Sequence, residues 1–321
     1  AIKSGIPKEK PAYIINQVCG SGIRSVVSGF QSIAMGDSNI IIAGGQENMS
    51  LAPHSIHLRD GKKIGDSAIV DTMIKDGLWD AFNDCHMGIT AENVANKFQV
   101  TRKEQDNFAL MSQHKALKAQ QENRFKDEIV AFQIKSQNAE INFSKDEHPR
   151  EGINLEALSR LKLAFAKEGT VTAGNSSGIN DGAAAVTLMS TQEAKKRGLK
   201  ELVTIKSWAS CGVDPALMGT GPIPSVKKAL DLAGWSINDI DLFEINEAFA
   251  AQSIAVIKTL SIPEEKVNIN GGAIALGHPI GASGTRILVT LIHEMIKSDA
   301  HKGLATLCIG GGMGIALCVE R

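Results

Sequence analysis

The chain has 321 residues, of which 43% are hydrophobic, and a formal net charge of −1. This length is enough to bury a large core in two or three lobes. A net charge near zero gives no reason to expect nucleic acid or an anionic membrane as a partner. No apolar run reaches the roughly 20 residues that cross a bilayer, so the composition predicts no membrane span.

The five cysteines are widely scattered and form no Cys-x-x-Cys pair. They are Cys19, Cys85, Cys211, Cys308 and Cys318. An odd number without paired spacing argues against a disulfide framework and against a structural zinc site. We therefore expect free thiols in a reducing compartment such as the cytoplasm, and no metal. Each cysteine is either core filling or a reagent.

The first element expected in chain order is a strand–turn–helix–strand unit over residues 16–45. The turn at Gly20-Ser-Gly22 opens a helix that Gly36-Asp37 ends. A continuous apolar run over residues 39–43 predicts a strand buried on both faces. The apolar residues predicted on the inner side of the helix are Ile23, Val26, Val27, Phe30 and Ile33.

The same unit recurs near the far end of the chain. Gly281-Ala-Ser-Gly-Thr-Arg286 aligns with Cys19-Gly-Ser-Gly-Ile-Arg24, and each segment precedes an amphipathic helix and then an apolar strand that ends in glycines. The shared order of elements favours an internal duplication. In α/β sheets, ligands collect at the carboxyl ends of strands, where these glycine turns fall.

A polar segment over residues 51–168 separates the two copies and predicts an inserted lobe. Thr101-x-x-Glu104 is a capping box that opens a helix running to about Asn123. Residues 129–134 alternate as a strand does. From Thr170 the apolar pattern returns, with a helix expected over 225–233, a strand over 241–245 and a helix over 247–260.

Cys19 is the first candidate for chemistry. It lies just before a turn that opens a helix, where free backbone N–H groups and the helix dipole lower a thiol pKa from about 8.5. We therefore expect a reactive thiolate. The alternative is a small hydrophobe in the core, the usual place of a lone cysteine.

Three further positions are candidates. His278 stands on a loop stiffened by Pro279, directly before the second copy of the turn. Cys308 ends a predicted buried strand and leads into a glycine run that suits an oxyanion hole. Asn246 follows a strand, and it is equally explained as a helix N-cap. Residues 174–178 match the Gly-x-Ser-x-Gly elbow of serine hydrolases, but the segment before them is too short and polar for the required strand.

Taken together, these segments resemble the thiolase family over essentially the whole chain. The motifs that carry the resemblance are Val18-Cys-Gly-Ser-Gly22, Gly44-Gly-Gln-Glu-Asn-Met-Ser50, Cys85-His-Met-Gly88, Thr90-Ala-Glu-Asn93, Gly169-Thr-Val-Thr-Ala-Gly-Asn-Ser-Ser-Gly178, Asn246-Glu-Ala-Phe249, Gly272-Ala-Ile-Ala-Leu-Gly-His-Pro-Ile-Gly281 and Cys308-Ile-Gly-Gly-Gly312. Each is modest evidence, but all of them in this order are highly specific.

The resemblance implies an acyltransferase of the short-chain, biosynthetic branch. Such enzymes condense two acetyl-CoA molecules to acetoacetyl-CoA and CoA, and catalyse the reverse thiolysis, without a cofactor. Cys19 is then the acylated nucleophile, His278 its base and Cys308 the second acid/base, while Asn246 holds a water and the backbone near Gly310 binds an oxyanion. Implied substrate contacts are His86, Met87, Arg150, Ser177, Met218, Ala248 and Phe249.

The resemblance also implies a five-layered, duplicated α/β fold with an inserted loop domain. The expected parts are an N-terminal half over 1–50 and 179–201, a loop domain over 51–178 and a C-terminal half over 202–321. The segment that precedes the Val-Cys-Gly-Ser-Gly motif in the family is largely absent, so we expect an incomplete N-terminal half of lower stability. A homodimer or homotetramer is implied, with residues 51–80 as the tetramer contact.

Three alternatives remain open. The first is a degradative 3-ketoacyl-CoA thiolase of longer chains, against which His86 and Met218 argue. The second is a condensing synthase acting on acyl carriers, which would carry a second histidine in place of Asn246. The third is an acyl-CoA-binding protein without activity.

Overall fold

A four-stranded sheet forms the centre of the C-terminal part of the protein. The computed structural model describes residues 1–59, 61–135 and 140–321. The sheet order is β10-β11-β12-β9, with β10 parallel to β11 and the other two pairs antiparallel. Its strands are β9 (Thr204–Gly212), β10 (Leu242–Ile245), β11 (Lys302–Ile309) and β12 (Met313–Glu320).

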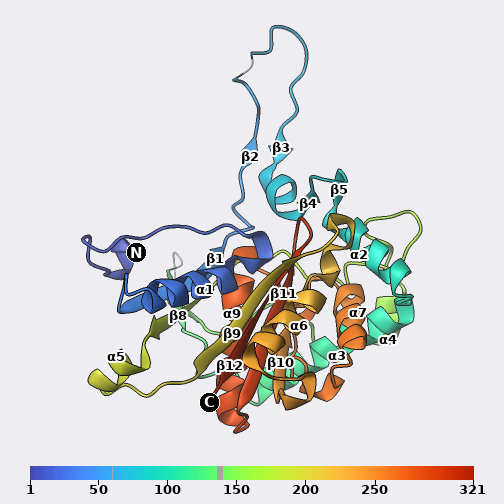
Figure 1. The fold of residues 1–321 in the computed structure, drawn as a ribbon. Coiled ribbons are helices and arrows are strands. Elements are labelled where there is room, and N and C mark those ends of the chain that lie inside the picture. Colours follow the sequence, from blue (N-terminus) through green and yellow to red (C-terminus); the bar gives the residue numbers. More distant parts are fainter. Residues whose placement is uncertain (60, 136–139) are drawn as a thin grey trace.

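Helices cover both faces of this sheet (Figure 1). Helix α9 (Ile280–Lys297) packs on one face against β10 and β11, and α6 (Pro222–Ala233) packs on the other against β9 and β12. Side chains of α7 (Ala250–Leu260) join the core on the α6 side. Because both faces are covered, β11 and β12 are buried along nearly their whole length.

A second, smaller sheet lies on the far side of α9. It pairs β1 (Ile40–Glu47) with β8 (Gly182–Met189) in antiparallel register. Helices α1 (Ser21–Ala34) and α9 both contact this sheet, and they also share one hydrophobic core with the four-stranded sheet. The order of layers is therefore two-stranded sheet, α1 and α9, four-stranded sheet, then α6 and α7. The alternation of sheets and helices expected from the sequence is confirmed, but the described residues form four layers, not the expected five, because none of the described elements covers the outer face of the two-stranded sheet.

The outer face of the small sheet corrects two predictions. β1 was expected to be buried on both faces, but the side chain of Ile42 is 60% exposed and only Ala43 is fully buried. Phe30 was expected on the inner side of α1, but it is exposed while Ile23, Val26 and Val27 are buried. Both errors have one cause, because α1 and α9 cover only the inner face of β1.

The two copies of the Ser-Gly motif touch each other where α1 and α9 cross. A Cβ atom on Gly22 would lie 2.3 Å from the backbone nitrogen of Thr285, and one on Gly284 would lie 2.5 Å from that of Ile23. Real Cβ atoms do not approach backbone this closely, so each helix needs a glycine at the contact. The duplication therefore places its own repeated glycines against one another.

The inserted lobe packs its long helices on α7 and on α8 (Ala273–Leu276). Helix α3 (Arg102–Gln121) begins with the predicted capping box of Thr101 and Glu104, which is confirmed. The lobe also contains α2 (Met87–Lys97), α4 (Leu155–Ser159) and three small antiparallel pairs: β2 (His54–Ser55) with β3 (Val70–Asp71), β4 (Trp79–Asp80) with β5 (Cys85–His86), and β6 (Phe132–Lys135) with β7 (Glu140–Phe143).

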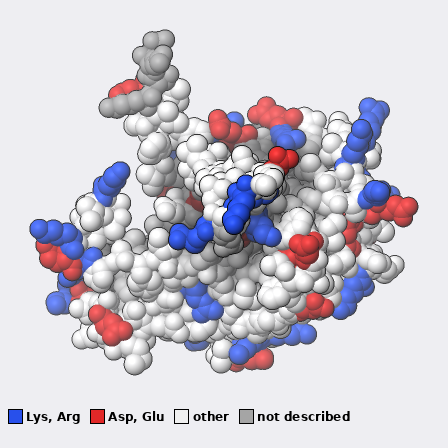
Figure 2. Space-filling model, turned by 90° about the horizontal axis from the view of Figure 1, so that it is seen from above, with Lys and Arg blue, Asp and Glu red and all other residues white. Residues whose placement is uncertain are grey.

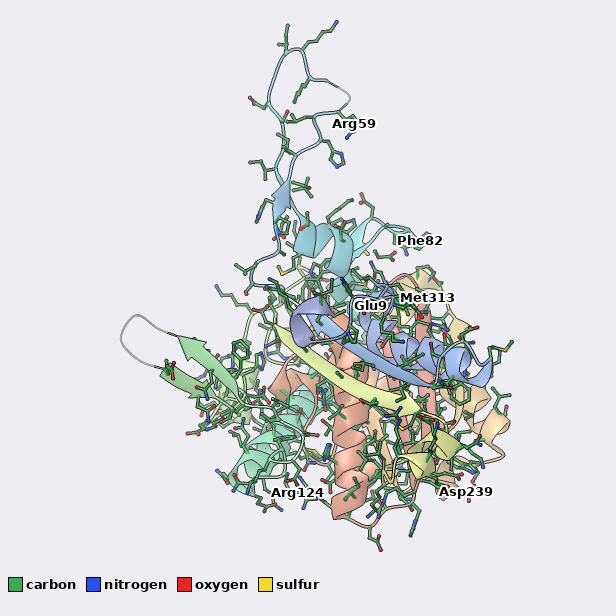
Figure 3. All side chains as sticks on the ribbon, turned by 90° about the vertical axis from the view of Figure 1, so that its left-hand side faces the viewer. Glu9, Arg59, Phe82, Arg124, Asp239 and Met313 are labelled. Atoms are coloured by element: carbon green, nitrogen blue, oxygen red, sulfur yellow. The ribbon has the colours of Figure 1, made fainter. Side chains whose placement is uncertain are left out.

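The segment that carries β2 and β3 projects far from the rest of the molecule (Figure 1). Figure 3 shows Arg59 far out on this projection, and Arg124 and Asp239 at the opposite end of the protein. A π-helical turn, Met73–Leu78, follows β3 at its base. The remaining short helix, α5 (Thr191–Lys196), follows β8.

Among the helices that the structure describes, none combines the length and the apolar composition needed to cross a bilayer.

Candidate active site

Four chain segments meet at the carboxyl end of β11. A 3-10 turn, Val18–Gly20, holds Cys19 and packs on both α9 and β11. His278 lies two residues before α9, Cys308 is the second-to-last residue of β11, and Asn246 directly follows β10. The four main candidate residues predicted from the sequence therefore lie on segments that the fold brings to one junction.

Two backbone N–H groups act on the Cys19 sulfur. Those of Cys19 itself and of Gly310 favour its charged form and lower its pKa. A Cβ on Gly310 would lie 2.4 Å from Cε of Met87, so a side chain there would have to displace the end of that methionine. Two converging N–H groups at a nucleophile are the arrangement that stabilises an oxyanion.

The residue before the nucleophile has a strained backbone. Val18 has φ 47°, in the left-handed region that β-branched residues rarely adopt. Its N–H donates to Oδ1 of Asn16 at 3.0 Å, and the hydroxyl of Ser21 donates to its carbonyl at 2.7 Å. These bonds hold the conformation that turns Cys19 into the junction.

The pKa values contradict the expected thiolate. Protein surrounds the Cys19 sulfur, and this burial raises its pKa to about 11 despite the two backbone donors. Burial, with a smaller contribution from the Arg286 charge, lowers the pKa of His278 to about 4. The prediction of a lowered Cys19 pKa is therefore wrong for the resting protein, in which the Cys19 thiol and the His278 imidazole are both uncharged. Burial also raises the pKa of Cys308, and the nearby Cys19 adds to this effect.

Hydrogen bonds fix His278 on three sides. Its backbone N–H donates to Oδ1 of Asn180 at 3.1 Å. Its ring Nδ1 lies 2.5 Å from Oγ of Ser283, and its Nε2 lies 3.4 Å from Nδ2 of Asn246. The buried Oδ1 of Asn246 has no partner among the described residues, so an acceptor is available here for a water or ligand. The sequence analysis missed Ser283 and Asn180, although Ser283 belongs to the repeated Ser-Gly motif.

Asn246 does not cap a helix. The helix expected over residues 247–260 begins at Ala250, and its N-cap position is Phe249. The next residue, Glu247, instead accepts hydrogen bonds from the Ser112 hydroxyl at 2.6 Å and the Asn268 amide at 2.8 Å. The side chain of Asn246 is thus free to face His278.

An apolar wall extends from the junction. Met87, Met218, Ala248 and Phe249 form one buried cluster with Cys308. Phe165 packs against this cluster, stacks on the ring of His86 with centroids 4.6 Å apart, and meets Phe249 edge-on at 6.1 Å. No sequence pattern marked Phe165, because a single aromatic residue in an irregular segment has no periodicity to reveal it.

The other predicted substrate contacts lie further out. The hydroxyl and the N–H of Ser177 both donate to the carbonyl of Ala248 at 3.0 Å, which fixes Ser177 beside the wall. Nδ1 of His86 accepts from the N–H of Gly88 at 3.0 Å and caps α2. Arg150 is exposed, outside the apolar cluster.

The serine-hydrolase alternative fails on geometry. Ser176 is buried and its hydroxyl donates to the carbonyl of Thr172 at 2.7 Å, so it is not presented as a nucleophile. The preceding residues form no strand of the kind that an elbow requires. Within the described residues, no three His, Cys, Asp or Glu side chains are grouped to hold a metal ion.

This fold and this set of groups are those of a cysteine-dependent acyltransferase. The sequence profile of "Thiolase, N-terminal domain" matches residues 1–192, and that of "Thiolase, C-terminal domain" matches residues 199–321. The chain belongs to the thiolase family.

Among its relatives, an acetyl-CoA acetyltransferase from Rhizobium meliloti is 60% identical over 321 residues, which is 100% of this chain and 82% of the relative. A cytosolic acetyl-CoA acetyltransferase from Rattus norvegicus is 54% identical over 100% of this chain and 81% of its own length. The solved acetyl-CoA acetyltransferase of Bacillus anthracis superposes with a TM-score of 0.97 at 46% identity, over 99% of this chain and 81% of that one. Human mitochondrial 3-ketoacyl-CoA thiolase gives 0.97 at 42% identity, over 100% and 81%.

Proposed function

We propose that this thiolase transfers acetyl groups between coenzyme A thioesters. It condenses two acetyl-CoA molecules to acetoacetyl-CoA and free CoA, and it catalyses the reverse thiolysis. The observation that carries the proposal is the position of Cys19 on a turn that packs on β11, which contains Cys308, and on α9, which His278 precedes, with the N–H groups of Cys19 and Gly310 acting on its sulfur. Relatives that are 54–60% identical over the whole chain are acetyl-CoA acetyltransferases.

In the first half-reaction, Cys19 is acetylated. Because both groups are uncharged at rest, the proton moves from the Cys19 thiol to Nε2 of His278 as the sulfur attacks the thioester carbonyl. The N–H groups near Cys19 and Gly310 stabilise the oxyanion. When the carbon–sulfur bond to CoA breaks, the Cys308 thiol gives its proton to the departing CoA sulfur.

In the second half-reaction, the Cys308 thiolate removes a proton from the methyl group of a second acetyl-CoA. The resulting enolate oxygen lies toward His278 and a water held by the free Oδ1 of Asn246. The carbanion attacks the acetyl group on Cys19, and the Cys19 sulfur leaves and recovers its proton from His278. Two cysteines are needed because one carries the acetyl group while the other moves protons.

The apolar wall suits the flexible arm of CoA. Met87, Met218, Ala248 and Phe249 pack with Cys308 in one buried cluster, which supports assigning them to the pantetheine arm, and Ser177 adds a polar edge. We assign His86, on which Phe165 stacks, to the acetyl end. We assign Arg150, which is exposed on the loop domain (51–178), to the nucleotide end of CoA. No resident cofactor is required, because CoA thioesters are the substrates.

A homodimer or homotetramer is the proposed assembly, with residues 51–80 as the tetramer contact. The projecting segment exposes large apolar side chains: Leu51, Ile56, Leu58, Ile64 and Ile69. Figure 2, which views the molecule from the side of this projection, shows Lys and Arg interspersed with Asp and Glu, not a field of one sign. All five cysteines are free, which supports a reducing compartment such as the cytoplasm.

Mass spectrometry after exposure to acetyl-CoA tests the proposal. The native protein is expected to gain one acetyl group on Cys19, and Cys19→Ser is expected to gain none. Cys308→Ala should still be acetylated, but more slowly, because the departing CoA sulfur loses its proton donor. It should lose condensation by about 10⁴-fold or more in kcat, since it retains the nucleophile but not the second proton carrier. Cys211→Ser, which changes a free cysteine on β9, is the matched control.

A native protein that is folded but never acetylated would overturn the proposal and favour acyl-CoA binding without chemistry. Activity on a series of 3-ketoacyl-CoA substrates decides the chain length. We expect acetoacetyl-CoA to be preferred, because Phe165 stacks on His86 at the end of the wall. Equal activity on long chains would favour the degradative type of enzyme.

A further inference from the structure

Ser283 is a fully buried residue in the first turn of α9, and its hydroxyl has two neighbours. Nδ1 of His278 lies 2.5 Å from its Oγ, and the carbonyl oxygen of Pro279 lies 2.9 Å away. Its exposed fraction is 0%, so no water competes for either bond. The hydroxyl has one proton, and it can donate to only one of these two neighbours.

The other side of the imidazole determines where that proton goes. If the serine donated to Nδ1, the neutral imidazole would carry its own hydrogen on Nε2, which would then face the Nδ2 donor of Asn246 at 3.4 Å. Two donors would oppose each other inside the protein, at a cost of about 1–3 kcal/mol. If the serine donates to Pro279, its lone pair meets a hydrogen on Nδ1, and Nε2 accepts from Asn246, whose amide turns Nδ2 toward the ring. The facing groups of Ser283, His278 and Asn246 are then paired as donor and acceptor.

The first copy of the repeat shows the same pattern. Ser21 is the counterpart of Ser283 in the Ser-Gly motif, and its hydroxyl accepts from the N–H of Gln17 at 2.8 Å and donates to the carbonyl of Val18 at 2.7 Å. Ser21 thus donates to a carbonyl that precedes its helix and accepts from a group before it. Ser283 repeats this arrangement if the imidazole hydrogen is on Nδ1.

We propose that Ser283 is a positioning residue that keeps the hydrogen of the neutral His278 ring on Nδ1 and leaves Nε2 unprotonated. The proposal rests on the role of His278 as the base, because only a bare Nε2 can receive the Cys19 proton. Ser283 acts through His278 and does not touch the substrate.

Nitrogen NMR on the whole protein with ¹⁵N-labelled histidine tests this directly. At pH 8 the imidazole is neutral, since its pKa is about 4. The signals of His278, assigned by their loss in His278→Gln, are expected to show a protonated Nδ1 and a bare Nε2. The opposite pattern in the native protein would overturn the proposal. This readout needs no substrate, so it is independent of whether Cys19 is acetylated.

Variants provide the kinetic test. Ser283→Ala is expected to mix the two tautomers and to lower kcat by about 10- to 100-fold, the range seen when the second partner of a functional histidine is lost, with little change in KM. Ser283→Thr, which retains the hydroxyl, should restore the native nitrogen pattern. Ser225→Ala is the matched control, because Ser225 is buried in α6 and donates to the Gly221 carbonyl at 2.9 Å without a histidine partner.

A Ser283→Ala protein with the native nitrogen pattern and native kcat would show that the hydroxyl has no such role. If Ser283→Ala unfolds, the nitrogen pattern of the native protein still decides the question.

Discussion

The two copies of the helix–strand unit share a motif but have different environments. In the first copy, β1 has one open face, with Ile42 60% exposed. In the second copy, β11 is buried on both faces, and Leu307 is 0% exposed. The helices differ in the same way, since α9 lies between two sheets while the outer side of α1 faces solvent.

This difference separates two tasks. The second copy provides His278 and Cys308, which are both buried and whose pKa values burial shifts. The first copy provides Cys19 from a strained turn. In the proposed mechanism, the two groups that only move protons, His278 and Cys308, are therefore buried residues, while Cys19, which carries the acetyl group, is a half-buried residue.

The largest expected effect is on stability, at matched apolar positions of the two strands. Leu307→Ala should lower the free energy of unfolding by about 2–5 kcal/mol, because it opens a cavity in a closed core. Ile42→Ala should cost under about 1 kcal/mol, because much of the side chain already contacts water. Urea unfolding of both variants measures the difference, and equal losses would mean that β1 is as well covered as β11.

The next largest effect is expected at the crossing of α1 and α9. Gly22→Ala should cost about 1–3 kcal/mol, because its Cβ would meet the backbone of α9 at 2.3 Å. Gly29→Ala, on the same helix, is the control. Its Cβ would meet side-chain ends of Leu188 and Ile41 at 2.8 and 3.1 Å, which can move. A gain of about 1 kcal/mol in helix propensity offsets that contact. Similar urea midpoints for the two variants would contradict the close crossing.

The smallest effect concerns the charge of the nucleophile. Because the Cys19 pKa is raised to about 11, the thiolate fraction should increase about tenfold per pH unit between pH 7 and pH 9. The rate of Cys19 alkylation by iodoacetamide should rise in parallel, without a plateau. A rate that levels off above pH 7 would indicate a resting thiolate–imidazolium pair instead.

Motifs were enough to place Cys19, His278, Cys308 and Asn246 on segments that meet, since glycine turns after buried strands define where a site forms. The layering also followed from the sequence, because the repeat revealed itself as a shared order of elements. The roles assigned to these residues remain proposals that the experiments above test.

The burial of β1, the pKa of Cys19 and the role of Asn246 could not be predicted from the sequence, because they depend on contacts with residues distant in the chain. The apolar run of β1 looks the same whether one face is covered or two. The helix-terminus argument for Cys19 gave the wrong sign for its pKa shift, because burial by the other half outweighs two N–H groups. Asn246 is of a residue type that often caps a helix, but three more residues separate it from the start of α7.

The crossing of Gly22 and Gly284 has a mechanical consequence. Gly22 follows Cys19 by three residues, and Gly284 follows His278 by six. At about 1.5 Å per helical residue, both Cys19 and His278 therefore lie within roughly two helical turns of the point where α1 and α9 cross. Because these chain distances are short, a shift of α1 against α9 at the crossing would move Cys19 relative to His278 by a similar amount. The absence of side chains at Gly22 and Gly284 therefore helps to set the separation of Cys19 and His278.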